Sequence, residues 1–424
     1  MSTPDFEVIV VGAGPAGAML TKELAKRRIS VLCIEEEAEV GYPNKSTAGT
    51  PVETFELFDI PTELSYSAIS GLRLYGPSEY YEVDFDSVFG RIMKFREVKQ
   101  YLIKEAIKLG ASIMVGTEAI DFLNQPGKNP VVKIKGFNGQ RSLTANVVVD
   151  ATGPESLFAF KLGLMPANKS SVKGSYSIDY FLKPGVGGAF EYFMDNAKPE
   201  KAKNGFFLDI FMGSKYSPGG YSWIFPTGDH QVKAGVCKMD PSYKMPGEKS
   251  QIDYFQKLWD ENPQIQNAQP FELHMCPYRH WVIGGLKSAT LDNFIAIGDA
   301  ATRFQPVFGE GIRASFYSAR FAAEAIERAT KKKDFSKKSL ELHDKLWIKK
   351  WGKSWDHSTL IYSVLYHSND KQIDQFIGSL RKLDFGALWN LYLGKATIKD
   401  YMSMIRHLPD FMDKDTLWKI VKSH

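Results

Sequence analysis

The chain has 424 residues, of which 44% are hydrophobic and 24% charged, a composition typical of a globular protein with two or three domains. Its formal net charge of +4 gives no indication of nucleic-acid binding, and no apolar run approaches the roughly eighteen residues of a membrane-spanning helix. No secretory signal precedes the first expected strand, and three scattered cysteines indicate neither a disulfide framework nor a metal site, so we expect a cytoplasmic protein. Cys33 lies in an apolar run, whereas pairing of Cys237 with Cys276 is left open.

The first elements along the chain form a β–α–β unit. Residues 6–11 (FEVIVV) predict a buried strand, residues 15–27 a helix, and residues 30–35 a second buried strand. A helical crossover between two such strands makes them parallel, so we expect them to be neighbours in a parallel sheet.

The link between the first strand and its helix carries the pattern GxGxxG. Gly12 permits the tight turn, Gly14 lets the backbone approach a pyrophosphate, and Gly17 lets the helix pack closely on the strand. Pro15 suits the first helical turn, where free N–H groups and the positive end of the helix face phosphates. Glu35 ends the second strand, where its carboxylate can accept hydrogen bonds from ribose hydroxyls. These features predict a dinucleotide site, and the alternative is a glycine-rich turn without a nucleotide.

A change of pattern follows the next elements of this domain. Residues 97–109 predict a helix with Gly110 as its left-handed cap, and strands are expected at 111–115 and 145–150. Residues 171–283 hold many aromatic residues and glycines and alternate with a period of two. This pattern indicates an antiparallel sheet in a second domain.

An aromatic strand lies within the second domain. Alternate side chains of a strand share a face, so Tyr221, Trp223 and Phe225 are expected to form a continuous wall. Pro226 ends this strand, and residues 230–237 return as its neighbour. The wall either lines a pocket for a bulky apolar substrate or belongs to an ordinary sheet core.

A buried strand followed by a helix returns near residue 291. The segment 293–301 (NFIAIGDAA), followed by 306–312 (PVFGEGI) and a long helix, resembles the second FAD fingerprint of the p-hydroxybenzoate-hydroxylase-like flavoproteins. The resemblance implies that Asp299 binds a ribityl hydroxyl, and the alternative role for Asp299 is a helix N-cap. Arg96 and the DATG turn that ends at Gly153 match the same group in order. FAD is therefore the expected cofactor, with the dipole of the long helix stabilising negative charge near N1 of the reduced flavin.

The expected fold class is α/β (α+β): a Rossmann-type FAD-binding domain that is interrupted by an antiparallel-sheet substrate domain and followed by a helical region. The predicted boundaries are 1–65, 95–170 and 285–330 for the FAD-binding domain, 66–94 and 171–284 for the substrate domain, and 331–424 for the C-terminal helices.

The segment GYSWIFP resembles the YxWxFP motif of the geranylgeranyl reductases, which include the archaeal digeranylgeranylglycerophospholipid reductases. The resemblance extends to about residue 330 through VIVVGAGPAG, EVGYP, DATGPES and GDAA…GEGI, and then weakly through the tail. It implies that the aromatic wall binds substrate. It also implies contacts with FAD at Ala16, Glu35, Ser46, Thr47, Gly49, Arg96, Ile120, Asp299, Gly311 and Ile312.

The family resemblance implies an enzyme that saturates isolated double bonds in isoprenoid chains of membrane lipids or prenyl diphosphates. Where the family often has a cysteine and a glutamate beside the flavin, this chain has Ser46 and Ala48, so the proton source is not evident. Glu310 is a candidate because burial would raise its pKa; a solvated rim carboxylate and a flavin-bound water are the alternatives. The electron donor is NADPH, ferredoxin or another reductant. A flavin monooxygenase or halogenase of the same fold, and a non-catalytic lipid-binding flavoprotein, are the competing functions.

The tail predicts a helix on which Trp347, Trp351 and Trp355 recur every four residues. This face either meets anionic lipid headgroups, in a peripheral contact with the membrane, or packs on the body of the protein. The lysines near it are Lys331, Lys332, Lys333, Lys345, Lys349, Lys350 and Lys353.

Overall fold

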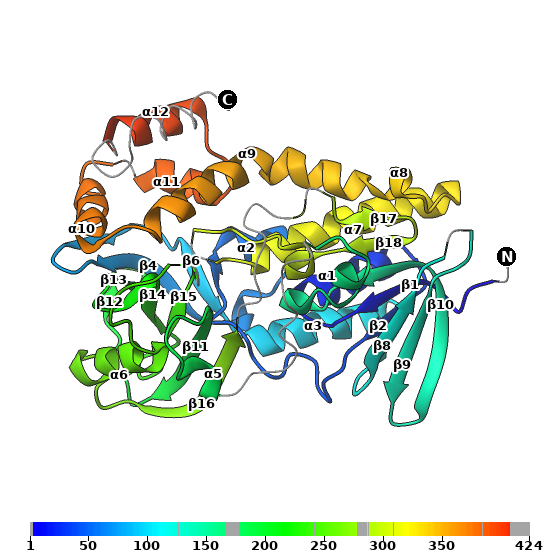
Figure 1. The fold of residues 1–424 in the computed structure, drawn as a ribbon, viewed down its shortest axis with the longest axis horizontal. Helices are drawn as coiled ribbons and strands as arrows, with labels where there is room; N and C mark the ends of the chain where they lie inside the picture. The colour runs from blue at the N-terminus through cyan, green and yellow to red at the C-terminus, as the bar shows by residue number, and fades with distance from the viewer. Residues whose placement is uncertain are drawn as a thin grey trace.

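Two β-sheets and a long C-terminal set of helices make up the computed structural model (Figure 1). The structure describes residues 3–125, 127–165, 178–240, 243–277, 286, 288–307, 309–383 and 385–407. Parts of the predicted second domain (171–177 and 278–284), the end of the predicted helical region (408–424) and the side chain of Lys353 lie outside the described residues.

The smaller sheet is the Rossmann-type sheet that the sequence predicts. Strands β18, β10, β1, β2 and β7 lie side by side in this order and run parallel, and β17 joins the β18 edge antiparallel. The far end of β10 continues into an antiparallel arm with β9 and β8. The strands are β1 (Phe6–Val11), β2 (Val31–Ile34), β7 (Ser112–Met114), β8 (Glu118–Leu123), β9 (Val131–Gly136), β10 (Gly139–Asp150), β17 (Thr290–Leu291) and β18 (Phe294–Ala296).

Both faces of this sheet are covered, which explains the uninterrupted apolar runs of its central strands. Helices α1 (Pro15–Lys26), α3 (Phe95–Lys108) and α7 (Ile312–Lys332) pack on one face, where α1 contacts both of the others. The arm and α4 (Leu157–Lys161) cover the other face. Short elements beside the sheets are α2 (Glu53–Leu57), α5 (Ile178–Phe181), η1 (Thr62–Leu64), η2 (Gly153–Glu155) and η3 (Gly298–Ala301).

The larger sheet has the order β16-β11-β15-β14-β13-β4-β6-β3, with β5 beside β4 and β12 beside β13. It is antiparallel except for β4 and β13, which run parallel because the chain passes through the Rossmann-type sheet between them and does not make a hairpin. Strand β3 belongs to this sheet although it lies within 1–65, the range predicted for the FAD-binding domain. The strands are β3 (Gly49–Pro51), β4 (Ser65–Tyr75), β5 (Tyr80–Asp84), β6 (Gly90–Met93), β11 (Gly188–Asp195), β12 (Lys201–Ala202), β13 (Gly205–Gly213), β14 (Ser217–Pro226), β15 (Val232–Lys238) and β16 (Gln269–Pro277).

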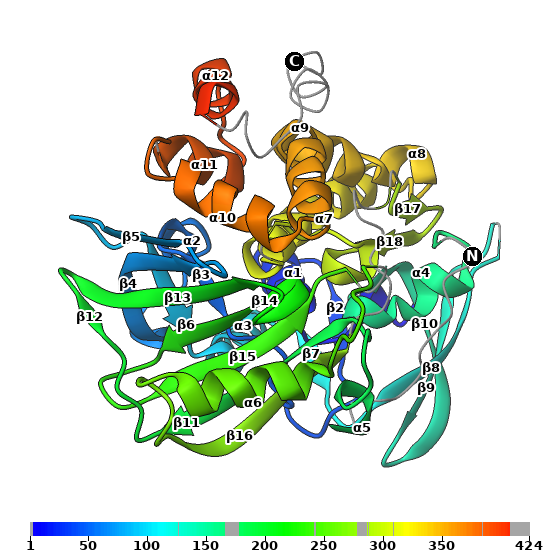
Figure 2. The ribbon, with the colours of Figure 1, turned by 60° about the vertical axis from the view of Figure 1, so that its left-hand side comes forward.

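Helices lie on both faces of the larger sheet (Figure 2). Helix α6 (Gln251–Glu261) packs on one face, and the C-terminal helices pack on the other. Helix α9 runs along α7 and reaches the larger sheet, so it joins the two halves of the molecule (Figure 1). The C-terminal helices are α8 (Lys337–Leu340), α9 (Leu342–Leu365), α10 (Asp370–Ser379), α11 (Phe385–Tyr392) and α12 (Ile398–His407).

The three tryptophans of α9 are buried, with exposed fractions of 2% for Trp347, 5% for Trp351 and 8% for Trp355. They pack against α7, where Tyr317 meets the ring of Trp351 edge-on at 5.6 Å between centroids. The hypothesis that these tryptophans meet lipid headgroups is therefore wrong, and the packing alternative holds. In the described part of the chain, no helix has both the length and the apolar character needed to cross a bilayer.

The cysteines are all free thiols. Cys237 on β15 and Cys276 on β16 both pair in register with Ala189 of β11, which runs between the two strands. Two strand spacings separate their Cα atoms by about 10 Å, which is beyond the reach of a disulfide. Pairing of Cys237 with Cys276, left open by the sequence, is thus excluded.

Candidate functional site

A cavity of about 710 Å³ opens at the carboxyl ends of β1 and β2 and extends between the larger sheet and the C-terminal helices. Its volume lies within the range of sites for cofactors and small ligands, and ligands of open α/β sheets bind at this end of the strands. Gly17 and Arg96 are the predicted site residues that do not line it. The predicted residues that do line it are Gly12, Gly14, Pro15, Ala16, Glu35, Ser46, Thr47, Gly49, Ile120, Gly153, Tyr221, Trp223, Phe225, Asp299, Glu310, Gly311 and Ile312.

The glycine pattern forms a tight junction between β1 and α1. Gly12 has φ +100°, and a Cβ there would lie 2.5 Å from the carbonyl oxygen of Ala151. A Cβ on Gly17 would lie 1.9 Å from the carbonyl oxygen of Gly12, so Gly17 serves the packing of α1 on β1. Gly14 has open space where a Cβ would project, and it precedes Pro15 at the first position of α1. The N-terminus of α1 therefore faces the cavity without side-chain obstruction.

Glu35 is fixed at the end of β2. Its carboxylate accepts hydrogen bonds from the backbone N–H groups of Ala13 (2.8 Å) and Glu37 (3.0 Å). Each carboxylate oxygen can accept a second hydrogen bond, so the group remains able to bind ribose hydroxyls.

Lys99 is a cavity residue that the sequence reasoning missed. It lies on the buried face of α3, is 5% exposed, and donates a hydrogen bond to the carbonyl oxygen of Gly41 (3.2 Å). Burial lowers the pKa of Lys99 to about 7, against the opposing effect of the Glu35 carboxylate. The signal was available, since Lys99 shares the helical spacing of the buried residues Leu102, Ile103 and Ala106. A lysine at this position places a titratable amine in the same cavity as Glu35 and the N-terminus of α1.

Asp299 lines the cavity from the turn η3, which follows β18 and lies close to the first turn of α1, where a Cβ on Gly298 would be 2.9 Å from the Cβ of Ala16. Its side chain is partly buried, and its Oδ1 is buried and has no hydrogen-bond partner within the described residues. A Cβ on Gly311 would lie 3.2 Å from this oxygen, so the glycine keeps the carboxylate open towards the cavity. Burial, followed by the nearby Glu310, raises the pKa of Asp299 to about 6. Neither η3 nor α7 has a side-chain N-cap, so the N-cap alternative for Asp299 is wrong.

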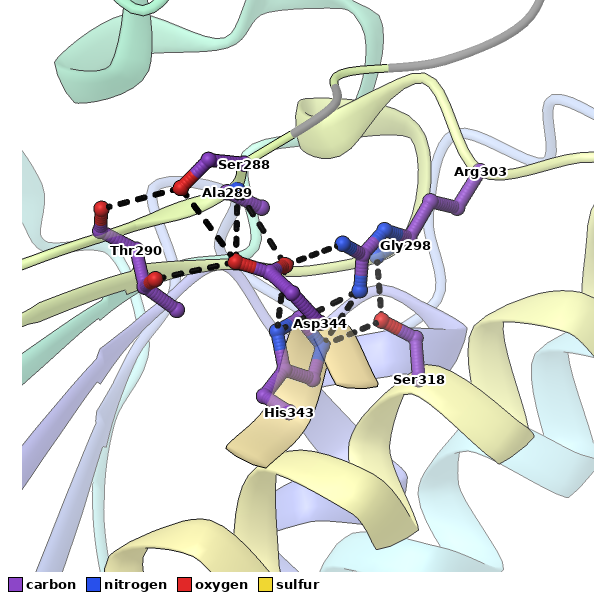
Figure 3. A network of polar contacts seen from close by, with 8 residues as sticks. All are labelled: Ser288, Ala289, Thr290, Gly298, Arg303, Ser318, His343 and Asp344. Carbon is purple, nitrogen blue, oxygen red and sulfur yellow. Dashed lines mark hydrogen bonds and ion pairs between the residues drawn. The ribbon is translucent and has the colours of Figure 1, made fainter. Parts of the chain in front are cut away.

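A buried polar network holds the turn of Asp299 against α9 (Figure 3). Arg303 donates to Asp344 and contacts His343 Nε2 at 2.8 Å, which in turn contacts the hydroxyl of Ser318 at 3.1 Å. The same hydroxyl accepts from the backbone N–H of Gly298 (3.3 Å). Burial lowers the pKa of His343 to about 4, so the histidine is neutral at neutral pH. Asp344 also accepts hydrogen bonds from Ser288, Ala289 and Thr290.

Glu310 is buried, so the alternative of a solvated rim carboxylate is wrong. Its Oε1 accepts from the backbone N–H of Arg313 (2.6 Å), and its Oε2 lies 3.7 Å from Arg313 Nε. Burial raises the pKa of Glu310, and the charge of Arg313 opposes that rise. Arg313 also donates to the carbonyl oxygens of Tyr392 and Leu393, which ties the start of α7 to the end of α11.

The aromatic residues of β14 form one wall of the cavity. The ring centroids of Tyr221 and Trp223 are 5.6 Å apart, and those of Trp223 and Phe225 are 6.4 Å apart. Gly235 on the neighbouring strand leaves room for Trp223, because a Cβ there would lie 2.5 Å from the indole. A Cβ on Gly49 would lie 2.9 Å from the ring of Phe225, so the loop predicted to pass the flavin packs against the wall.

The apolar end of the cavity is closed by the C-terminal helices, whose part in the site the sequence reasoning missed. The only signal was the apolar run ALWNLYL at 387–393, which also fits an ordinary packed helix. Residues of α9, α10 and α11, together with Leu380 directly after α10, line the cavity. They are Ile361, Phe376, Leu380, Phe385, Leu388, Trp389, Leu391 and Tyr392.

Arg96 lies in the first turn of α3, which begins at Phe95 and not at residue 97 as predicted. Its guanidinium is half exposed and pairs with Glu39, with Nε 2.9 Å from Oε1. A direct contact between Arg96 and FAD stays a prediction.

The geometry fits FAD, since an open helix N-terminus, a fixed acidic residue, a buried lysine and an unpartnered buried carboxylate follow one another along the cavity. A family model described as "FAD binding domain" matches residues 5–326, and the chain therefore belongs to this family of FAD-binding proteins. It is an FAD-dependent oxidoreductase.

Known proteins of similar sequence and structure are reductases and halogenases. The chain is 29% identical over 394 residues to the digeranylgeranylglycerophospholipid reductase of Haloferax volcanii, covering 90% of each chain. It is 27% identical to digeranylgeranylglycerophospholipid reductase 3 of Methanosphaera stadtmanae, covering 94% of this chain and 96% of the relative. A geranylgeranyl bacteriochlorophyll reductase-like protein from Thermoplasma acidophilum shares the fold with a TM-score of 0.79 at 21% identity, over 99% and 98% of the two chains. A triple mutant of a flavin-dependent brominase shares it with a TM-score of 0.70 at 16% identity, over 99% and 98%.

Proposed function

We propose that this protein is an FAD-dependent reductase that saturates C=C bonds of geranylgeranyl chains in membrane lipids or prenyl diphosphates. One observation carries the proposal: a single cavity joins a polar end suited to FAD with an apolar end bounded by the aromatic wall and helices α9 to α11. The reductase names of the sequence relatives agree with this arrangement.

The polar end would hold FAD along its length. The N-terminus of α1 and Lys99 would bind the diphosphate, Glu35 the ribose next to it, and the unpartnered oxygen of Asp299 a ribityl hydroxyl. Ile120 and Gly153 line the cavity with these residues. When reduced, FAD supplies a hydride to the double bond.

The apolar end would bind the isoprenoid chain and exclude water. An isolated double bond is electron-rich, so a hydride adds to it only as a proton reaches the other carbon. A dry pocket of aromatic faces favours the positive charge that develops on carbon at that stage. Trp223, at the centre of the wall and 5% exposed, is placed for this role.

The test is anaerobic incubation of the reduced, flavin-loaded protein with a geranylgeranylated glycerophospholipid, followed by mass spectrometry. We expect each turnover to add two hydrogens to the lipid and to reoxidise one flavin. A protein that binds FAD but adds no hydrogen to this lipid or to geranylgeranyl diphosphate does not have the proposed function.

A monooxygenase or halogenase of the same fold is the second candidate, favoured only by the shared fold of the brominase. The same reduced protein distinguishes the two in air. A halogenase or monooxygenase consumes oxygen to modify its substrate, and a halogenase also needs halide, whereas the proposed reductase works without either.

The proposal includes an electron donor, which is NADPH, ferredoxin or another reductant, and a peripheral contact with the cytoplasmic face of the membrane, where the lipid lies. Because the α9 tryptophans are buried, such a contact would need other residues. Pelleting with anionic lipid vesicles at low and high salt tests it, and absence of binding at low salt would rule it out.

A further inference from the structure

A buried acidic residue, Glu191, lines the cavity beside the aromatic wall. It lies on β11, is 2% exposed, and its Oε2 accepts hydrogen bonds from the indole Nε1 of Trp223 (3.2 Å) and from the hydroxyl of Thr47. Thr47 belongs to the loop that is predicted to pass the flavin, and Trp223 to the wall that would face the substrate. Glu191 is therefore joined to both sides of the proposed reaction site.

The other oxygen of Glu191 contacts a histidine that also lines the cavity. Oε1 lies 2.7 Å from Nδ1 of His274, the residue directly opposite on β16, whose side chain is 3% exposed. Nε2 of His274 lies 2.9 Å from Oε1 of Glu272, whose side chain is 39% exposed. Glu191 and His274 thus both line the cavity, and the Nε2 of His274, which has no hydrogen-bond partner within the described residues, lies at ion-pair distance from the partly exposed Glu272.

A buried lysine, Lys233, lies close to Glu191 and Thr47. It lies on β15, is 1% exposed, and donates to the carbonyl oxygen of Thr47 (3.3 Å) between the rings of Tyr66 and Phe193. Burial alone would raise the pKa of Glu191, but the hydrogen bond from His274 and the charge of Lys233 lower it overall. Glu191 is thus held as the carboxylate, the form that accepts the hydrogen bonds of Thr47 and Trp223.

We propose that Glu272, His274 and Glu191 form a proton path from solvent to the cavity, with the Thr47 hydroxyl at its inner end. The inference rests on the proposed function and names the proton source that the sequence left open. The alternative candidate, Glu310, is bound to Arg313 instead.

The step balances with one proton and one hydride. The Glu191 carboxylate first takes a proton from His274. The Thr47 O–H bond then breaks as its proton forms a C–H bond with one alkene carbon, and Thr47 takes up the proton of Glu191, which becomes a carboxylate again. The hydride, with its electron pair, goes from reduced FAD to the other carbon, so the alkene is reduced and FAD is oxidised. Glu272 then passes a proton from solvent to His274, which restores the starting state.

The test compares Glu191→Gln, His274→Gln and Glu272→Gln with Asp195→Asn, a matched change at the exposed end of the same strand β11. The amide in Glu191→Gln still accepts from Trp223 and Thr47 but carries no transferable proton. We expect FAD content within about twofold of the wild type and lipid-driven flavin reoxidation about 100-fold slower in Glu191→Gln and His274→Gln. Glu272→Gln should be slowed less and should recover as the concentration of a small buffer acid rises, because it removes only the solvent end.

A readout independent of turnover is the proton NMR spectrum of the flavin-loaded protein. A downfield signal from the ring N–H of His274 bound to a carboxylate should be present in the wild type and Asp195→Asn, and absent from Glu191→Gln and His274→Gln. Wild-type reoxidation in Glu191→Gln would overturn the proton path while leaving the reductase function intact. A wild type that adds no hydrogen to isoprenoid lipids would overturn the proposed function, and the path with it.

Discussion

Lys99 sets the charge at the nucleotide end of the cavity, and its titration should be visible in FAD binding. Burial lowers its pKa to about 7, so it is charged below that pH and neutral above it. In the proposed function the diphosphate of FAD binds the charged form, so binding above the pKa must take up a proton. We expect affinity for FAD to fall by up to tenfold per pH unit between about pH 7 and 9, as measured by flavin fluorescence titration of the flavin-free protein.

Two lysine variants on α3 distinguish the effect of Lys99 on FAD affinity from a general effect of losing one positive charge. Lys99→Gln should bind FAD about tenfold more weakly near pH 6.5 and should lose the decline above pH 7. Lys104→Gln, on the exposed face of the same helix, should retain both the affinity and the decline. The same decline in Lys99→Gln as in the wild type would show that another group titrates.

The sequence predicted site residues whose role depends on residues close to them in the chain. It did not predict residues that meet partners far away in the chain. Gly12 and Glu35 sit in a short β–α–β unit, so their spacing alone located them. Glu191 and His274 are 83 residues apart and meet only through the register of β11 and β16, which no local pattern fixes.

The junction of β1 with α1 allows a test at the scale of one element. A Cβ on Gly17 would lie 1.9 Å from the carbonyl oxygen of Gly12, whereas a Cβ on Gly14 would meet nothing within 4 Å. We therefore expect Gly17→Ala to destabilise the flavin-free protein by about 1–3 kcal/mol, because the helix must move off the strand. Gly14→Ala should leave the melting temperature of the flavin-free protein unchanged and weaken FAD binding, because the added methyl projects into the phosphate site. Equal melting temperatures for the two variants would contradict this division of roles.

The network between α9 and the turn of Asp299 makes the fold sensitive to acid. The pKa of His343 is about 4 in the folded protein and about 6.5 in an unfolded chain, so the unfolded state binds more protons between these values. The contribution of His343 to the free energy of unfolding should therefore be fully present above about pH 6.5. The free energy of unfolding should fall by about 3 kcal/mol as the pH drops towards 4. Urea unfolding across this range measures it.

His343→Gln should be less stable at neutral pH, but its stability should change less between about pH 6.5 and 4. His230→Gln, an exposed histidine, should keep the wild-type dependence. An unchanged slope in His343→Gln would show that other groups cause the acid sensitivity.

The sequence predicted which segments form helices and strands better than it predicted which other segments they pack against. The four-residue spacing of Trp347, Trp351 and Trp355 shows one face of a helix, but an apolar face of this kind fits a membrane as well as α7. The sequence likewise does not predict the parallel pairing of β4 with β13, because about 130 residues, including β7 to β10 of the Rossmann-type sheet, separate the two strands.

At the scale of the whole molecule, the cavity is assembled from three parts of the chain that are far apart in sequence: the β1–α1 region, the aromatic strand β14 and the C-terminal helices. Tyr362 of α9 donates to the carbonyl oxygen of Met239 (2.7 Å), and Tyr366 donates to that of Val307, in the loop before α7. Helix α9 therefore holds the substrate side and the flavin side of the cavity in one arrangement, which the sequence did not predict because it assigned this helix no part in the site.

A substitution on α9 should consequently change which chain lengths are accepted. Ile361 lines the apolar part of the cavity and is 7% exposed, so Ile361→Trp should fill space needed by the far end of a geranylgeranyl chain. We expect kcat/KM for the geranylgeranyl substrate to fall about tenfold or more, with little change for the shorter geranyl substrate, since loss of several buried CH₂ groups costs more than 1 kcal/mol. Ile348→Trp, on the exposed face of the same helix, should change neither value. Because FAD would bind at the other end of the cavity in the proposed function, the flavin content of Ile361→Trp should stay at the wild-type level. An equal loss for both chain lengths would place the substrate elsewhere.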